Sequence, residues 1–110
     1  MDIDSLTIGD AKELAKLFGG AQKPCPFEVG KAYLIRTVTM TQVGRVKEVI
    51  GDFLVLEDAA WVASTGRFNE CVVNGAVDEV EPFTNDAIVG LGSICDATEW
   101  PHPLLREVRG

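Results

Sequence analysis

The sequence predicts a mainly β protein: a small SH3-like or Sm-like barrel of five strands, preceded by an N-terminal α-helix and followed by a proline-rich tail. Three observations support this class. Apolar residues have helical spacing near the start, the spacing changes to two after Lys31, and glycines interrupt the strand-like segments. With 110 residues, the chain is expected to form one domain, with the helix in 1–20, the barrel in 30–98 and the tail in 99–110.

The first expected element is a short amphipathic helix. Thr7 to Asp10 resembles a capping box, and Gly19-Gly20 is typical of a helix end. Lysines and a glutamate take the face opposite the apolar one, which consists of Leu6, Ala11, Leu14, Ala15, Leu17 and Phe18. Such a helix either covers the open end of a sheet or packs against a neighbouring subunit. The connector from Lys23 to Pro26 cannot continue a helix because of its prolines.

The next expected elements are the strands of a bent sheet. Period-two spacing predicts one strand from Lys31 to Met40 and a second from Val43 to Ile50, in which Gly44 marks a bulge or a sharp bend. Gly51-Asp52 predicts a hairpin turn into a third strand that ends at Glu57-Asp58, where a charged loop is expected. Pairing between the first and last strands would bring the sheet round on itself.

Shorter elements are expected in the second half of the chain. Thr65 is positioned to cap a helical turn over 67–73, which Asn74-Gly75 ends. Strands are then expected over 79–83, 87–90 and 93–97, with Gly90-Leu91-Gly92 as a turn. The prolines after Trp100 predict an extended tail that docks on its own domain or on a partner.

Composition restricts the partners and the location. The chain has 17 acidic and 10 basic residues and a net charge of −7, so we expect no general nucleic-acid binding. The N-terminus is acidic where a secretory signal would be basic, and no apolar run approaches the roughly 20 residues of a membrane helix. We therefore expect a soluble, cytoplasmic protein that does not bind membranes.

No motif predicts an enzyme. The cysteines Cys25, Cys71 and Cys95 are far apart and only His102 could serve as their base, so we expect reduced, mostly buried thiols. No metal-binding pattern and no cofactor motif is present in the sequence. The expected activity is therefore binding without catalysis.

One set of residues is a candidate anion site. Arg45 follows Gly44 and Arg67 follows Gly66, and arginine side chains beside exposed backbone amides suit a phosphate or a carboxylate. The predicted ligand-binding set is Arg45, Arg67, Phe68, Glu57, Asp58 and Thr65. The alternative is that each arginine pairs with a nearby acid, among Glu48, Glu57, Asp58 and Glu70. Phe68 could stack on a ligand ring, whereas core packing is expected for Trp61, and Trp100 is expected to hold the tail.

Several segments together resemble a family of short domains of unknown function encoded mainly in tailed-bacteriophage genomes. They lie between Gly30 and Glu107 and are Arg36-Thr37-Val38-Thr39, Gly44-Arg45, the run from Val55 to Phe68, Glu79-Val80-Glu81-Pro82-Phe83 and Trp100-Pro101-His102-Pro103-Leu104. The resemblance implies a phage origin and transfers no catalytic residue.

Three hypotheses of function follow from the residues and the resemblance. The first is a homo-oligomer, such as a ring, that sequesters a small anionic, nucleotide-like host-defence signal in the host cytoplasm. The second is a virion protein, such as a capsid decoration or tail component, that uses the N-terminal helix and the tail as clamps. The third is an acidic protein that inhibits a host defence enzyme by direct docking.

Overall fold

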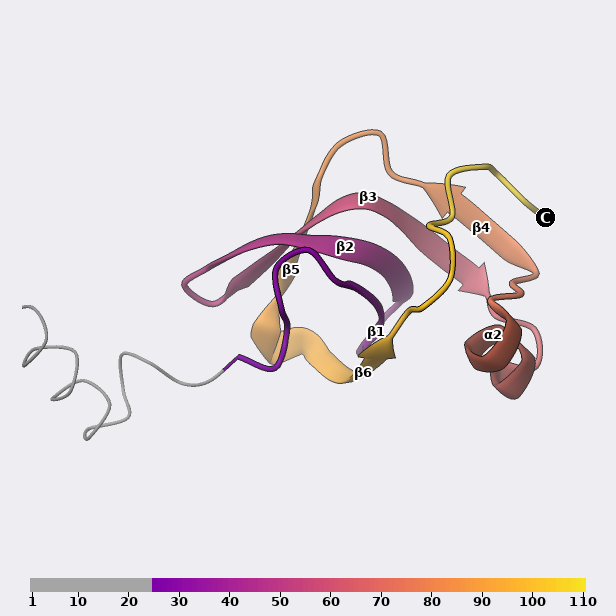
Figure 1. Cartoon of the computed structure of the whole chain (residues 1–110), viewed down its shortest axis with the longest axis horizontal. Helices are drawn as coiled ribbons and strands as arrows, with labels where there is room; N and C mark the ends of the chain where they lie inside the picture. Colours follow the sequence, from indigo (N-terminus) through magenta and orange to yellow (C-terminus); the bar gives the residue numbers. More distant parts are fainter. Residues whose placement is uncertain (1–24) are drawn as a thin grey trace, which may run out of the picture.

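The computed structural model describes residues 25–110, so the predicted N-terminal helix lies outside the described residues (Figure 1). The described part is a sheet of six antiparallel strands with one α-helix and one 3-10 turn. In chain order the elements are β1 (Ala32–Thr37), β2 (Thr41–Ile50), β3 (Phe53–Ser64), α2 (Phe68–Asn74), β4 (Glu79–Pro82), β5 (Ala87–Gly90), η2 (Leu91–Ser93) and β6 (Ile94–Glu99). A mainly β fold is therefore confirmed; it has six strands, one in each of the segments expected to be a strand, whereas the barrel as a whole was expected to have five.

The sheet is open, and its strands follow the order β4-β3-β2-β1-β6, with β5 paired to β3 as well. The long strand β3 pairs with β5 along its first half and with β4 along its second half. Strand β1 pairs with β6, as expected for the first and last strands, with Ile35 opposite Ala97. The β2–β3 hairpin turns at Gly51, whose φ of 56° lies in the left-handed region that glycine tolerates.

The main correction concerns the end of β3. The Glu57-Asp58 pair was expected to end this strand, but the strand continues through Trp61 to Ser64. The two acids lie at a bulge, because the register with β2 shifts between Val43 and Arg45. Asp58 takes a positive φ of 49° there, and Gly44 lies opposite the extra residue. The predicted irregularity at Gly44 is therefore confirmed.

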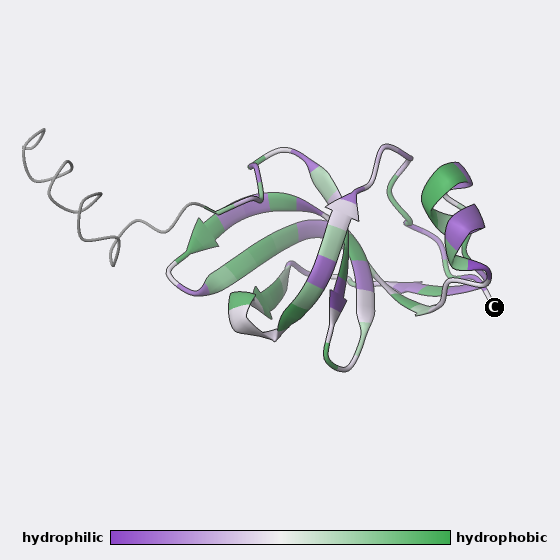
Figure 2. Cartoon of the chain, turned by 90° about the horizontal axis from the view of Figure 1, so that it is seen from below, coloured by the Kyte–Doolittle hydropathy of each residue, from purple (hydrophilic) through white to green (hydrophobic). Residues whose placement is uncertain are grey.

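Two apolar clusters lie on the two faces of the sheet, because neighbouring residues of a strand point to opposite sides. In β1, Ile35 belongs to one cluster and Leu34 to the other. The first cluster contains Tyr33, Ile35, Val46, Leu54, Leu56, Ala59, Ala87 and Val89. The second contains Leu34, Val43, Ala60, Val62, Cys71, Val77, Val80 and Trp100. Figure 2 shows apolar stretches in green along the strands, interrupted by polar residues in purple.

The helix α2 and the tail cover the second cluster. The predicted helical turn is confirmed, and it ends at Gly75 with a φ of 72°. Its predicted cap is wrong, because Arg67 occupies that position without a side-chain bond and the Thr65 hydroxyl donates to the carbonyl of Gly66. Trp100 is buried and holds the tail against its own domain, whereas Trp61, expected in the core, is an exposed residue.

The prediction that the cysteines are mostly buried is also wrong. Cys71 is buried, and burial raises the pKa of its thiol, but Cys25 and Cys95 are exposed. All three are free thiols in the described residues. Among residues 25–110, no helix has the length and the apolar character needed to cross a membrane.

Candidate functional site

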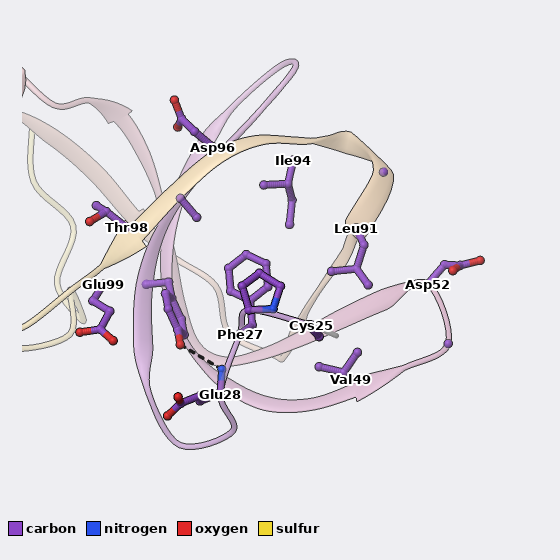
Figure 3. Close-up of a pocket in the computed structure, with 15 residues that line it drawn as sticks. Cys25, Phe27, Glu28, Val49, Asp52, Leu91, Ile94, Asp96, Thr98 and Glu99 are labelled. Atoms are coloured by element: carbon purple, nitrogen blue, oxygen red, sulfur yellow. Dashed lines mark hydrogen bonds between the residues drawn. The ribbon is translucent and has the colours of Figure 1, made fainter. Parts of the chain in front are cut away.

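An open groove of about 1040 Å³ lies in the described part of the chain (Figure 3). Four segments form its walls: the residues before β1, the β2–β3 turn, η2 and β6. The groove opens directly over the first apolar cluster, because Tyr33 belongs to both. It therefore gives a ligand access to apolar side chains that the sheet leaves partly uncovered.

The floor of the groove is apolar. Phe27, Val49, Leu91 and Ile94 are partly buried and pack against the first cluster. The Phe27 ring meets the Tyr33 ring edge-on, with the centroids 5.0 Å apart and the planes at 83°. The backbone amide of Glu28 donates to the Tyr33 hydroxyl at 2.9 Å. These contacts fix the segment before β1 against the sheet, so the groove has a formed wall at residues 25–28.

The rim of the groove carries four carboxylates, which Figure 3 shows around the apolar floor: Glu28, Asp52, Asp96 and Glu99. Lys31 lies 3.1 Å from Glu28 and 3.2 Å from Glu99, so one ammonium serves two carboxylates. Asp96 is paired with Arg36, and Asp52 has no ion pair among residues 25–110. Four negative charges against two positive ones leave the rim with a net charge of about −2.

The predicted anion-binding arginine Arg45 is fully engaged by acids of its own domain. Its Nε donates to Glu57 at 2.9 Å, and its Nη2 donates to Asp58 at 2.6 Å. Glu57 lies directly opposite Arg45 in the β2–β3 register, and the bulge turns Asp58 toward the same guanidinium. The three residues form one compact group in which a single guanidinium pairs with two carboxylates. The alternative of local pairing therefore describes Arg45.

The remaining predicted site residues lie elsewhere. Arg67, Phe68 and Thr65 follow the end of β3, whereas Arg45 is opposite Glu57 near its middle. At ~3.3 Å per residue, the stretch from Glu57 to Ser64 separates the two groups by about 20 Å. Neither Arg45 nor Arg67 lines the groove or the smaller hollow of about 290 Å³ beside the β1–β2 turn. Neither of these two hollows therefore brings Arg45 and Arg67 together.

Phe68 is half-exposed and holds a different arginine. The Arg36 guanidinium lies over its ring, 4.7 Å from the centroid. The same guanidinium pairs with Asp96 through two hydrogen bonds, of which the one from Nε measures 2.6 Å. This contact links β1, β6 and α2. The sequence did not indicate this role of Arg36, because its partners lie far along the chain. Asp96 is 60 residues away in β6, and Phe68 lies in α2, which follows β3.

The Arg36–Asp96 pair predicts a pH dependence of stability. Hydrogen bonding to Arg36 lowers the pKa of Asp96 below its usual value of 3.8. A lowered folded-state pKa stabilises the protein at pH values above 3.8, and this contribution is lost as the pH falls through the folded-state pKa. We expect Asp96→Asn to be less stable than the wild type at neutral pH.

The check is urea denaturation of both proteins across a pH series. The difference in the free energy of unfolding should shrink as the pH falls well below 3.8, because protonated Asp96 then resembles asparagine. A difference that stayed constant over the whole series would mean that the pair contributes nothing through its charge.

The groove itself could not be found by sequence motifs, because its walls come from four separate segments. The one available signal was Phe27, an aromatic residue directly after the Lys23 to Pro26 connector. Within residues 25–110, no group of three or more His, Cys, Asp or Glu side chains is arranged to hold a metal ion. No protein-family model, curated protein or solved structure matches the chain.

Proposed function

We propose that this chain is a phage-encoded, non-enzymatic module that binds other proteins, and that its groove holds a basic amphipathic segment of the partner. The observation that carries this proposal is the groove's chemistry: a partly buried apolar floor inside a rim of net negative charge. An apolar face with flanking lysines or arginines would bury against the floor and be attracted by the rim.

The state of the arginines also supports protein binding over anion capture. Arg45 and Arg36 are both neutralised by carboxylates of the domain, so an anion would have to displace these pairs. The described residues carry 13 acids and 7 bases, which repels small anions at long range. Sequestration of a nucleotide-like signal stays a prediction, and calorimetry against cyclic dinucleotides is expected to give no binding heat.

The proposal also includes the type of barrel to which the sheet belongs. The strands β5, β3, β2, β1 and β6 follow one another as neighbours, and η2 joins β5 to β6. This order supports an incompletely closed SH3-like or Sm-like barrel. Strands β5 and β6 each pair on one side only within the described sheet, so edge-to-edge joining of subunits into a homo-oligomer is part of the proposal. Light scattering tests that part.

Binding to the groove is tested by fluorescence anisotropy of a labelled amphipathic peptide of leucine and lysine, titrated to millimolar concentration. The blocking variant is Ala97→Arg, because Ala97 is exposed, lines the groove and lies opposite Ile35 of the first cluster. We expect this variant to bind at least about tenfold more weakly, since a long cation occupies the floor. The control is Cys95→Arg, a change to the same residue on the same exposed strand, outside the groove.

Two results would contradict groove binding. One is equal affinity of the wild type and Ala97→Arg, and the other is equal binding of a scrambled peptide of the same composition. Peptide mass spectrometry of purified virions then separates the two protein-binding classes. Stoichiometric presence favours a capsid or tail component, and absence favours an inhibitor of a host enzyme.

A further inference from the structure

We infer that two copies of this chain associate through strand β5, which pairs antiparallel with β5 of the second copy about a twofold axis. This dimer is a specific form of the homo-oligomer in the proposed function, on which the inference rests, and it does not depend on what binds in the groove. Three features of β5 support it: unpaired backbone groups, a side-chain gap at Gly90 and exposed apolar residues beside that gap.

One edge of β5 has no partner strand among residues 25–110. The amide of Leu91 donates to the carbonyl of Asp52, which continues the β3–β5 ladder. Because the bonding direction alternates along a strand, Val89 points its backbone groups toward β3, and Ile88 and Gly90 point theirs to the free edge. The hollow of about 290 Å³ borders the same three residues, so this edge is open to approach.

The outward backbone groups of β5 match those of a second copy when the two strands run antiparallel. Ile88 then lies opposite Gly90 of the second copy, and each such pair exchanges two N–H···O bonds. Val89 lies on the twofold axis, opposite Val89 of the second copy. The Gly90 carbonyl accepts a bond from the Ser93 hydroxyl at 2.7 Å, but a carbonyl oxygen has a second lone pair for the new bond.

Gly90 leaves a gap on the outer face of the sheet, and Ile88 of a second copy fits it. Among residues 25–110, a Cβ atom added at Gly90 would meet only the Ser93 hydroxyl oxygen, at 4.0 Å, so the space above this residue is open. Phe53 lies opposite Gly90 in the β3–β5 register and is 53% exposed. In the proposed register Ile88 of the second copy, which is 69% exposed in a single chain, lies over Gly90 and reaches the Phe53 ring.

The apolar surface around this gap extends beyond the seam. Ile50 is exposed and lies opposite Phe53 in the β2–β3 hairpin. Pairing of β5 would remove the Phe53 and Ile88 side chains of both copies from water. The seam is short and each chain carries a net charge of −7, so we expect a weak dimer that strengthens when salt screens the charge.

The free edge of β5 is better suited to self-pairing than the free edge of β6. Charged side chains on an edge strand discourage pairing with another chain. Strand β6 contains Asp96 and Glu99, and like charges would meet if it paired with itself. Strand β5 consists of Ala87, Ile88, Val89 and Gly90 and carries no charge.

Sedimentation velocity over a concentration series tests the seam. At about 0.15 M salt we expect the full-length chain to shift from monomer to dimer between about 10 µM and about 1 mM. Ile88→Lys should weaken this dimer at least about tenfold. The control is Val73→Lys, which makes the same change of charge at a 61% exposed residue of α2 and should leave the dissociation constant unchanged. Equal dissociation constants for Ile88→Lys and the wild type would overturn the inference.

Disulfide formation tests the register, in a chain whose Cys25 and Cys95 are replaced by serine. Val89→Cys would place two Cα atoms about 4.5 Å apart across the axis, within the range of a disulfide. Ile88→Cys is the control, because its two copies would lie about 8 Å apart although this residue is the more exposed of the two. With oxidised glutathione as oxidant, we expect cross-linked dimer from Val89→Cys alone. Preferential cross-linking of Ile88→Cys, or of neither variant, would overturn the inference.

These measurements separate the dimer from the proposed function. Association without cross-linking of Val89→Cys leaves a homo-oligomer standing and overturns the β5 seam. A mass above that of two chains overturns closure as a dimer, and a monomer at every concentration overturns association altogether. A dimer that cross-links through Val89→Cys but binds no leucine–lysine peptide supports this inference and overturns the groove proposal.

Discussion

Replacing Trp100 by alanine is expected to lower the free energy of unfolding by about 3–5 kcal/mol. The indole is only 4% exposed and belongs to the second apolar cluster. Its Nε1 donates to the carbonyl of Pro103 at 3.1 Å, and its ring meets the His102 ring edge-on with centroids 4.9 Å apart. Alanine would leave a cavity and remove both contacts.

The measurement is urea denaturation at neutral pH, and Trp61→Ala is the matched control. Trp61 is 37% exposed, so its truncation should cost at most about 2 kcal/mol, since less of its apolar surface leaves water on folding. Equal losses for the two variants would contradict the view that the tail is part of the core.

The burial of Trp100 also bears on function, because Trp100 and other residues of the tail hold the tail against its own domain. Arg106 donates to the carbonyls of Ala59 and Phe83, and Arg109 forms a bridge with Val80 of β4. His102 bonds to the carbonyl of Val72 in α2. Through these contacts the tail is bound to its own domain. A virion role that uses the tail as a free clamp is therefore less favoured than one that uses the groove.

The fold was largely predictable because its signals are local. Period-two spacing and Gly51 predicted the β2–β3 hairpin, and the Asn74-Gly75 pair predicted the end of α2. The continuation of β3 through Glu57 and Asp58 was not predictable in this way. Two acids normally end an apolar strand, but here Arg45 on the neighbouring strand donates a hydrogen bond to each of them. That compensation depends on register, which one strand does not specify.

The candidate site was predicted less well, for a related reason. Glycine–arginine pairs suggested that two guanidinium groups converge, but Arg45 and Arg67 lie at different positions along β3. The groove joins Phe27 and Val49 with η2 and β6, and no local pattern relates these segments. A site assembled from distant segments can be identified only from the structure, whereas a strand or a turn can be predicted from its own residues.

The bulge opposite Gly44 leads to the second large expected effect. A Cβ atom at this position would lie 3.0 Å from the Cβ of Ala59 and 3.0 Å from the Cβ of Leu56. Both neighbours are fully buried, so they cannot move aside into solvent. We expect Gly44→Val to lower the free energy of unfolding by about 3 kcal/mol, because overpacking forces the two strands apart.

A double variant shows whether this close contact is the cause. Ala59→Gly removes one of the two Cβ neighbours, so Gly44→Val combined with Ala59→Gly should lose less stability than the sum of the two single changes. Denaturation of the four proteins gives the coupling energy, and exact additivity would mean that the contact is absent. Separation of the strands here would also displace Arg45, which follows Gly44, from Glu57 and Asp58. Calorimetry on Gly44→Val therefore also tests whether Arg45 binds an anion once it is released from these two acids.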